Sequence, residues 1–337
     1  MARCPPNSVT GVNGWYPDGT GPGRLPGPTD TIRVNWGNNT VTLTNVAPNV
    51  SGFQLGLDES GHLVVQGGGS LTAVGSSADR VGNNPNAGVI GRLTVCTNGV
   101  VNSAAVMEVG ASATGILTID GGSCNFSNHL WVGGGAVGVS SGTIILTNGG
   151  VLNMLGVGGN GMIGLGTNNA SSASGGIGTI KVSNGSTLNL FNIDASGKFI
   201  WPGSVLDVSR SGVVTIPGNR VAVMGNYTNA GRITACGGLG TVGIDYNNTN
   251  VGKTTLYAIA PVAPPRQSIT GATASGGNVT LTYQTTAGHI YHIESTASLS
   301  PALWTPVAGS ITNATGASVT FTFPTSGDPT FYRTVSP

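Results

Sequence analysis

The chain has 337 residues, a formal net charge of +1 and only 7% charged residues. Binding to phosphate groups needs clustered Lys and Arg, so this composition excludes nucleic acid and gives no basic patch for an anionic membrane. No stretch approaches the roughly 20 apolar residues of a membrane helix, so we expect no membrane insertion. The 57 glycines, with many β-branched residues, favour an all-β protein over a disordered chain.

Residues 1–36 are rich in proline and glycine and contain Trp15, Tyr16 and Trp36. The repeats that follow predict a solenoid, whose end offers open strand edges unless something covers it. We expect this segment to be a cap on its own chain or an arm reaching a neighbouring subunit, with the three aromatic side chains as possible ligand or partner contacts. Met1-Ala-Arg-Cys-Pro-Pro lacks the apolar run of a signal peptide, which fits a mature secreted form or a cytosolic protein; composition favours the secreted form.

A short phrase recurs through residues 37–260: a glycine or serine, an alternating apolar stretch, and an Asn-Gly or Gly-Gly turn. A recurrence of about 25 residues marks a solenoid, in which each unit buries its apolar face only against its neighbours. Clear copies begin at Gly91, Gly115, Gly142 and Gly178, weaker ones at Ser204 and Gly231, and less regular ones upstream at Asn39, Gly52 and Gly61.

The alternation within each copy has a period of two residues, which is typical of strands. Two inward columns of apolar side chains follow from it, one before the turn and one after it. They comprise Leu93/Val95, Leu117/Ile119, Ile144/Leu146, Ile180/Val182 and Leu206/Val208, and then Val101, Leu152/Met154, Leu188/Leu190 and Val214/Ile216. A third strand ends in an apolar residue before glycine, as at Val109 and Val132. Three short strands per coil predict a parallel β-helix.

The Asn-Gly pairs at 98–99, 148–149 and 184–185 should form one corner of each coil, because both residue types tolerate the left-handed conformation. The same pairs could form β-hairpin turns, but hairpins would not need a fixed 25-residue spacing. The longest interval between copies contains the small, polar stretch 166–176, which we predict to be a loop that bulges from one coil.

Three prolines in Ile259-Ala-Pro-Val-Ala-Pro-Pro-Arg266 cannot continue a strand ladder, so we expect a linker over 261–266. The repeat is lost beyond it. Residues 267–337 contain short alternating stretches that predict a small antiparallel β-sandwich of immunoglobulin or fibronectin character. These stretches are Val279–Tyr283, His289–Glu294, Leu303–Val307, Val319–Phe323 and Phe331–Val335.

The four cysteines match no metal-binding spacing. Cys96 and Cys236 hold the same place in repeats that lie about 24 Å apart, too far for a disulfide. Cys124 falls where other repeats carry an inward apolar residue, so we interpret it as a small core residue, with a disulfide as the alternative. The sequence leaves open whether Cys4 is free or bridged.

The acidic residues do not form the paired carboxylates that a glycosidase needs, because Asp120, Asp194 and Asp207 lie at different phases of their repeats. His289 and His292 are three residues apart on a strand and so face opposite sides, which is poor geometry for one metal ion. No phosphate-binding loop or nucleophile motif is present. We therefore predict no enzyme, and no catalytic residue, metal or cofactor.

Trp131 lies between two inward residues, Leu130 and Val132, so its side chain should point outward. An exposed tryptophan on a flat coil indicates a possible contact site for a sugar or a protein partner, against the alternative of scattered surface hydrophobicity.

The Gly-x-Leu-x-Val/Ile-x-x-Gly units resemble the repeats of autotransporter-passenger-type β-helices of secreted bacterial surface proteins. A similar likeness holds for the C-terminal residues, which resemble a terminal module of large secreted bacterial proteins. The motifs that carry it are Tyr291-His-Ile-Glu-Ser295, Leu299-Ser300 with Trp304, and Phe331-Tyr-Arg333. The resemblance implies an extracellular location at a cell surface and a role in adhesion, display or assembly.

From these observations we predict a structural extracellular protein that assembles head to tail with copies of itself into a filament, sheath or surface layer. Stacked coils end in unpaired backbone groups, and low charge leaves little repulsion between subunits. The alternative is a monomeric adhesin or carbohydrate-binding protein that uses Trp131 and the 166–176 loop on surface glycans. A polysaccharide-degrading enzyme is a third, weaker hypothesis.

Overall fold

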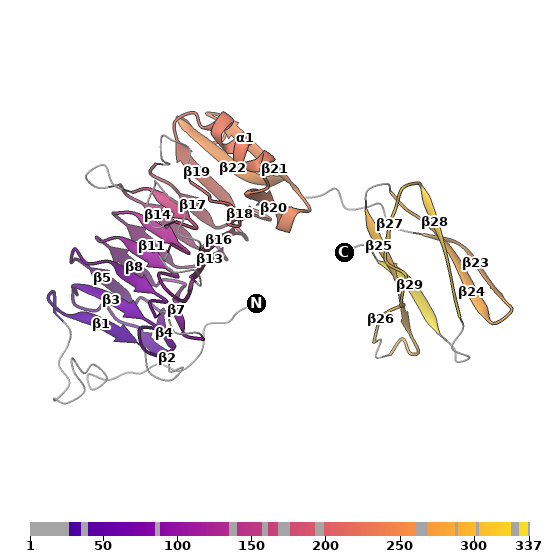
Figure 1. The fold of residues 1–337 in the computed structure, drawn as a ribbon, viewed down its shortest axis with the longest axis horizontal. Helices are drawn as coiled ribbons and strands as arrows, with labels where there is room; N and C mark the ends of the chain where they lie inside the picture. Colours follow the sequence, from indigo (N-terminus) through magenta and orange to yellow (C-terminus); the bar gives the residue numbers. More distant parts are fainter. Residues whose placement is uncertain are drawn as a thin grey trace. The chain divides into compact units, whose positions relative to one another are not determined.

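The computed structural model describes residues 27–34, 40–84, 88–134, 140–156, 161–167, 176–192, 199–259, 268–286, 289–300, 303–324 and 330–335. The chain divides into two compact units, Met1–Pro261 and Val262–Pro337. The first is a parallel β-solenoid of about 6 turns, which confirms the fold predicted from the repeat (Figure 1). The predicted linker 261–266 and most of the predicted loop 166–176 lie outside the described residues.

The strands of the solenoid form three sheets, here called A, B and C, and most coils contribute one strand to each. Sheet A contains β1 (Thr31–Val34), β3 (Gly52–Leu55), β6 (Asp79–Val81), β9 (Met107–Val109), β12 (Leu130–Val132) and β15 (Ile163–Leu165). Sheet B contains β2 (Thr40–Leu43), β4 (Gly61–Val65), β7 (Ile90–Cys96), β10 (Thr114–Asp120), β13 (Ser141–Thr147), β16 (Ile177–Val182), β18 (Val205–Val208) and β20 (Ile233–Ala235).

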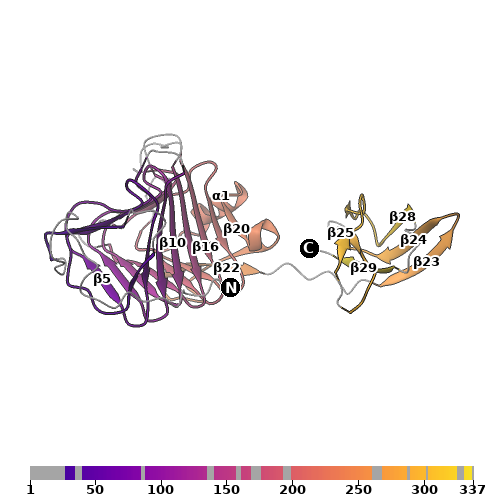
Figure 2. The same ribbon diagram turned by 90° about the horizontal axis from the view of Figure 1, so that it is seen from below.

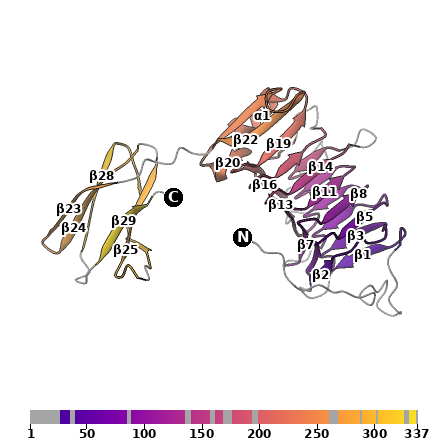
Figure 3. The ribbon, with the colours of Figure 1, turned by 180° about the vertical axis from the view of Figure 1, so that it is seen from behind.

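Sheet C contains β5 (Ser70–Ala73), β8 (Val100–Ser103), β11 (Ser123–Phe126), β14 (Val151–Met154), β17 (Thr187–Asn189), β19 (Val213–Pro217), β22 (Lys253–Ile259) and β21 (Thr241–Tyr246). Figures 1 and 3 show the successive strands of the solenoid stacked along its axis, and Figure 2 shows β10 and β16 among the side-by-side strands of sheet B. The first solenoid strand, β1, lies inside the segment 1–36 that we expected to be a cap or an arm.

The predicted inward columns are confirmed by the strand register. Leu117 aligns with Leu93 on one side and Ile144 on the other, and Cys124 aligns with Val101 and Leu152 in the second column. All six of these side chains are completely buried. Because parallel in-register strands place like positions next to each other, the repeat produces one continuous apolar core along the solenoid.

Two kinds of corner explain why the repeat begins with glycine and ends in Asn-Gly. Asn98, Asn148 and Asn184 have φ angles of 63°, 54° and 52°, as the predicted corner requires. At the opposite corner the backbone of one coil crosses the next so closely that a Cβ on Gly142 would lie 2.1 Å from the carbonyl oxygen of Val109. Any larger residue at this position would collide with backbone that cannot move aside.

The C-terminal end of the solenoid departs from the predicted repeat. The weak copy at Gly231 does add a parallel strand, since β20 pairs with β18. Before it, however, the chain forms helix α1 (Val221–Asn229), and after it a short 3₁₀ turn (Cys236–Gly238) leads into the antiparallel strands β21 and β22. Met224 and Tyr227 of α1 are buried in the solenoid core, and Tyr227 packs edge-on against Phe199. The chain thus closes this end itself (Figure 1).

The second unit is all-antiparallel, as predicted, and is built on two sets of paired strands. One contains β23 (Ile269–Ser275), β24 (Asn278–Gln284) and β28 (Ser318–Pro324), and the other β26 (Thr305–Pro306), β25 (Ile290–Thr296), β27 (Thr312–Asn313) and β29 (Phe331–Val335). Side chains from both sets share one core: Leu281, Tyr283, Tyr291, Ile293, Ala314 and Phe323. No helix in the described residues is long and apolar enough to cross a membrane.

Candidate functional site

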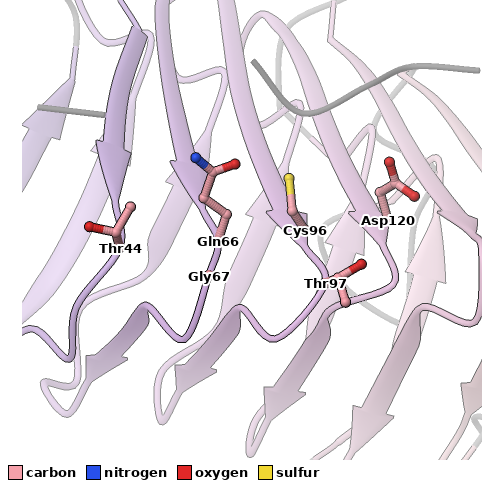
Figure 4. A pocket seen from close by; sticks show the side chains of 6 residues that line it. All are labelled: Thr44, Gln66, Gly67, Cys96, Thr97 and Asp120. Atoms are coloured by element: carbon pink, nitrogen blue, oxygen red, sulfur yellow. The ribbon is translucent and has the colours of Figure 1, made fainter. Parts of the chain in front are cut away.

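A shallow groove of about 370 Å³ runs along the outer side of the first coils, where the strands of sheet B end (Figure 4). It is lined by Thr44, Gln66, Gly67, Cys96, Thr97 and Asp120. The register of sheet B explains this row, because Leu43, Val65 and Val95 are aligned and Cys96 aligns with Asp120. The residues after aligned positions must also be neighbours, so β2, β4, β7 and β10 each bring a side chain to the same groove.

Two of the side chains that line the groove, Asp120 and Cys96, are already bonded. Asp120 accepts a hydrogen bond of 2.6 Å from the side-chain amide of Asn148, which belongs to the next corner. Cys96 is disulfide-bonded and therefore has no reactive thiol. The other two described cysteines, Cys124 and Cys236, are free, and burial raises the pKa of Cys124 well above its usual range. This confirms the interpretation of Cys124 as a small core residue.

A second feature, on the outer side of sheet C, is a ladder of amide side chains that joins successive coils. The Nδ2 of each asparagine donates a hydrogen bond to the ladder side chain of the preceding coil. Its Oδ1 accepts a hydrogen bond from the ladder side chain of the following coil. The ladder runs from Thr72 through Asn102, Asn125, Asn153 and Asn189 to Thr215, with donor–acceptor distances of 3.1, 2.9, 2.9, 2.8 and 2.7 Å. We call these six residues the asparagine ladder.

The asparagine ladder was visible in the sequence but was not recognised there. Each of its asparagines directly follows a residue of the second inward column, as in Val101-Asn102 and Leu152-Asn153. Amide side chains that repeat at one strand position in a parallel stack can pair from coil to coil, as they do in cross-β assemblies. The ladder side chains on the outer face of sheet C therefore hold successive coils together.

One carboxyl group lies inside the solenoid, where an apolar side chain is expected. Asp79 begins β6 in the inward column that contains Phe53 and Met107, and it is completely buried. Its oxygens accept hydrogen bonds from the backbone N–H of Phe53 at 2.8 Å and from the hydroxyl of Ser103 at 2.5 Å. Burial raises the pKa of Asp79 to about 6, against the opposing effect of these two hydrogen bonds. With no exposed surface, this acid is structural.

Trp131 occupies the outward phase of β12, as predicted, but the expected exposure is wrong: only 7% of the residue is exposed. Its ring stacks on His129 with centroids 5.2 Å apart. The neighbouring strand places Gly164 opposite it, and a Cβ there would come within 2.7 Å of the indole. The glycine makes room for the ring, so the tryptophan covers the sheet instead of standing free for a ligand.

The remaining predicted contact residues, Trp15, Tyr16 and Trp36, lie outside the described residues. The two histidines of the C-terminal unit do not come together on one metal-binding face. His292 shares its side of β25 with Glu294, at 3.4 Å, while Tyr291 and Ile293 point into the core. In the part of the chain that the structure describes, no group of three or more His, Cys, Asp or Glu residues could hold a metal ion.

Several other acids are also engaged in structural contacts. Glu108 pairs with Arg80 of the preceding coil at 2.6 Å, and Asp207 accepts hydrogen bonds from Thr234 and from the backbone of Gly237. These bonds tie neighbouring coils or close the last turn.

Comparison with known proteins finds no matching family model, no matching curated protein and no matching solved structure.

Proposed function

We propose that this chain is a secreted, structural protein that self-associates at a bacterial cell surface as part of a filament, sheath or surface layer. The resemblance of its repeats and C-terminal motifs to secreted bacterial surface proteins supports the setting. The polar side chains of the solenoid support the structural role, because the asparagine ladder, Asp79 and the Arg80–Glu108 pair all hold the coils together. The disulfide at Cys96 supports an oxidising compartment.

The observation that carries self-association is strand β23 of the C-terminal unit. It stands at the edge of its sheet, and all seven of its residues are exposed. In the described residues it pairs only with β24, which leaves its other edge with unpaired backbone groups. Natural edge strands are usually protected by lysine, proline or inward charges, and Ile269–Ser275 contains none of these. The pairing of β23 with β24 shifts its register only between Ile269 and Gly271, so the rest of the strand is regular.

The C-terminal end of the solenoid is a poorer candidate for the contact. Head-to-tail stacking of coils needs a parallel strand edge at both ends of the solenoid. Helix α1 and the antiparallel pair β21–β22 close the C-terminal end instead. We therefore assign the contact to β23, which would pair with a strand of a second copy, and low net charge leaves little repulsion between copies.

The test compares the full chain with two lysine variants by sedimentation velocity over a range of concentrations and by electron microscopy. Thr273→Lys places a charge in the middle of β23, and Thr315→Lys places the same charge on an exposed residue outside the strands. We expect concentration-dependent assembly of the wild type and of Thr315→Lys, with an association constant at least tenfold weaker for Thr273→Lys. A monodisperse monomer at every concentration, or equal assembly of the two variants, would overturn the proposal.

A further inference from the structure

The Asn-Gly corners of the solenoid differ in their hydrogen bonds, although their sequences are alike. The pairs 148–149 and 184–185 hold equivalent places in successive coils, because the strands before and after the corner are in register. Their backbones also match, with φ angles of 54° and 79° in the first pair and 52° and 75° in the second. Any difference in their reactivity must therefore come from the groups around them.

The first difference is the backbone N–H of the glycine. In an Asn-Gly pair this nitrogen can attack the side-chain amide carbon of the asparagine, because glycine has no side chain to block the approach and both groups belong to one residue pair. The N–H of Gly149 donates to the carbonyl oxygen of Asn184 at 3.0 Å, and that of Gly99 to the carbonyl oxygen of Cys96 at 2.8 Å. Within the described residues, the N–H of Gly185 donates to no acceptor, and this glycine is exposed.

The second difference lies at the amide oxygen of the asparagine. Strand register places Arg210 at the same corner position one coil after Asn184, and its guanidinium donates to Asn184 Oδ1 at 3.2 Å. The Nδ2 of Asn184 donates to the hydroxyl of Thr147 at 2.9 Å, which fixes the orientation of the amide. A cation at the amide oxygen stabilises the negative charge that develops there when a nucleophile adds to the amide carbon.

The corner at Asn148 offers the opposite electrostatics. The Nδ2 of Asn148 donates to the carboxylate of Asp120 at 2.6 Å, and no residue that the structure describes donates to its Oδ1. A neighbouring carboxylate disfavours further negative charge on the amide. The chain therefore contains its own matched comparison for Asn184.

We propose that Asn184 is a site of spontaneous deamidation, in which Gly185 supplies the nucleophile and Arg210 polarises the amide. The backbone nitrogen of Gly185 loses its proton to water and bonds to Cγ of Asn184. The Cγ–Nδ2 bond breaks, and Nδ2 takes up a proton from water and leaves as ammonia. Water then adds to either carbonyl carbon of the succinimide ring, which yields aspartate or isoaspartate at position 184. The sequence of steps transfers no electrons and needs only water as co-reactant.

The aspartate product fits the same corner. A carboxylate at position 184 would face the guanidinium of Arg210, so a hydrogen bond to a neutral amide would become a charge-assisted one between two coils. Because Arg210 is exposed, this ion pair would add little stability. The modification would change the charge of the corner while leaving the coils joined.

Peptide mapping of the full chain by mass spectrometry, after incubation at mildly alkaline pH, measures the reaction at each corner. We expect aspartate and isoaspartate at position 184 to accumulate about tenfold faster than at positions 98 and 148. In denaturant the three rates should become similar, because the corners are lost. Equal rates in the folded chain, the same excess at position 184 in denaturant, or aspartate without isoaspartate would overturn the proposal.

Arg210→Met tests the role of the guanidinium, because methionine keeps a long side chain but donates no hydrogen bond. We expect deamidation at position 184 to slow about tenfold, to the rate at position 148. Arg92→Met is the matched control, since it removes an exposed arginine from β7 and should leave the rate unchanged.

A purely restraining role of Arg210 would give the opposite sign. If the guanidinium only held the amide of Asn184 still, Arg210→Met would speed the reaction. Faster or unchanged deamidation in this variant would therefore overturn the assigned role. None of these measurements depends on self-association, so this proposal and the proposed function can fail separately.

Discussion

At the scale of single residues, the positions that define this protein are those where the backbone or a buried group leaves no alternative. Gly142 begins a repeat because the carbonyl oxygen of Val109 occupies the space of a side chain. Gly164 is small because the ring of Trp131 lies over it. Asp79 is a carboxyl group in an otherwise apolar column. Its burial is offset by the hydrogen bonds that it accepts from the backbone N–H of Phe53 and the hydroxyl of Ser103.

Asp79 predicts a specific pH dependence of stability. Its pKa in the folded chain is about 6, above the ordinary value of 3.8. Between these two pH values the unfolded chain loses the proton while the folded chain keeps it, so stability falls as pH rises. A shift of about two pH units corresponds to about 3 kcal/mol, fully lost above pH 6.

Asp79→Asn should remove this loss, because an amide can still accept from Phe53 and bind Ser103 without ionising. We compare the free energies of unfolding of the variant and the wild type, measured in denaturant. The difference, variant minus wild type, should rise by about 3 kcal/mol from pH 4 to pH 7. The difference between the two proteins cancels the contributions of other titrating groups. A difference that does not change with pH would show that the carboxyl is not protonated in the fold.

At the scale of elements, the coil is held to its neighbours by an inner apolar column and an outer polar one. The strands of sheets A and C are only three to five residues long for much of the stack, and such short strands form few backbone hydrogen bonds. Side-chain pairs across the coils add to those bonds. The asparagine ladder does so over five successive steps on sheet C.

Asn125 lies in the middle of the asparagine ladder, where it both donates to Asn102 and accepts from Asn153. Asn125→Ala should lower the free energy of unfolding of the solenoid by about 1–3 kcal/mol, since it removes two hydrogen bonds of about 0.5–1.5 kcal/mol each. Asn226→Ala in helix α1 is the matched control, because Asn226 is exposed and alanine favours a helix. Equal losses in the two variants, measured by chemical denaturation, would contradict a stabilising ladder.

At the scale of the whole molecule, the chain contains two units with separate apolar cores. Separate cores predict two unfolding transitions in calorimetry. Tyr291→Ala should lower only the transition of the C-terminal unit and Leu117→Ala only that of the solenoid, each by about 2–5 kcal/mol, because both side chains are completely buried. A single substitution that shifts both transitions equally would show that the units unfold together.

The sequence by itself determined the solenoid, because units that alternate apolar and polar residues at a fixed spacing bury their apolar faces by stacking on one another. The inward columns, the Asn-Gly corners and the place of Cys124 all follow from that periodicity. It also predicted the antiparallel strands after the linker, whose alternation is clear within each short stretch.

The tertiary structure alone decided what depends on neighbours from other coils. Periodicity gives the direction of a side chain but not what lies over it, so Trp131 was correctly placed outward and wrongly expected to be exposed. The closing helix α1 breaks the repeat and has no periodic signal. The groove and the asparagine ladder arise only when residues 22 or more positions apart become neighbours through strand register.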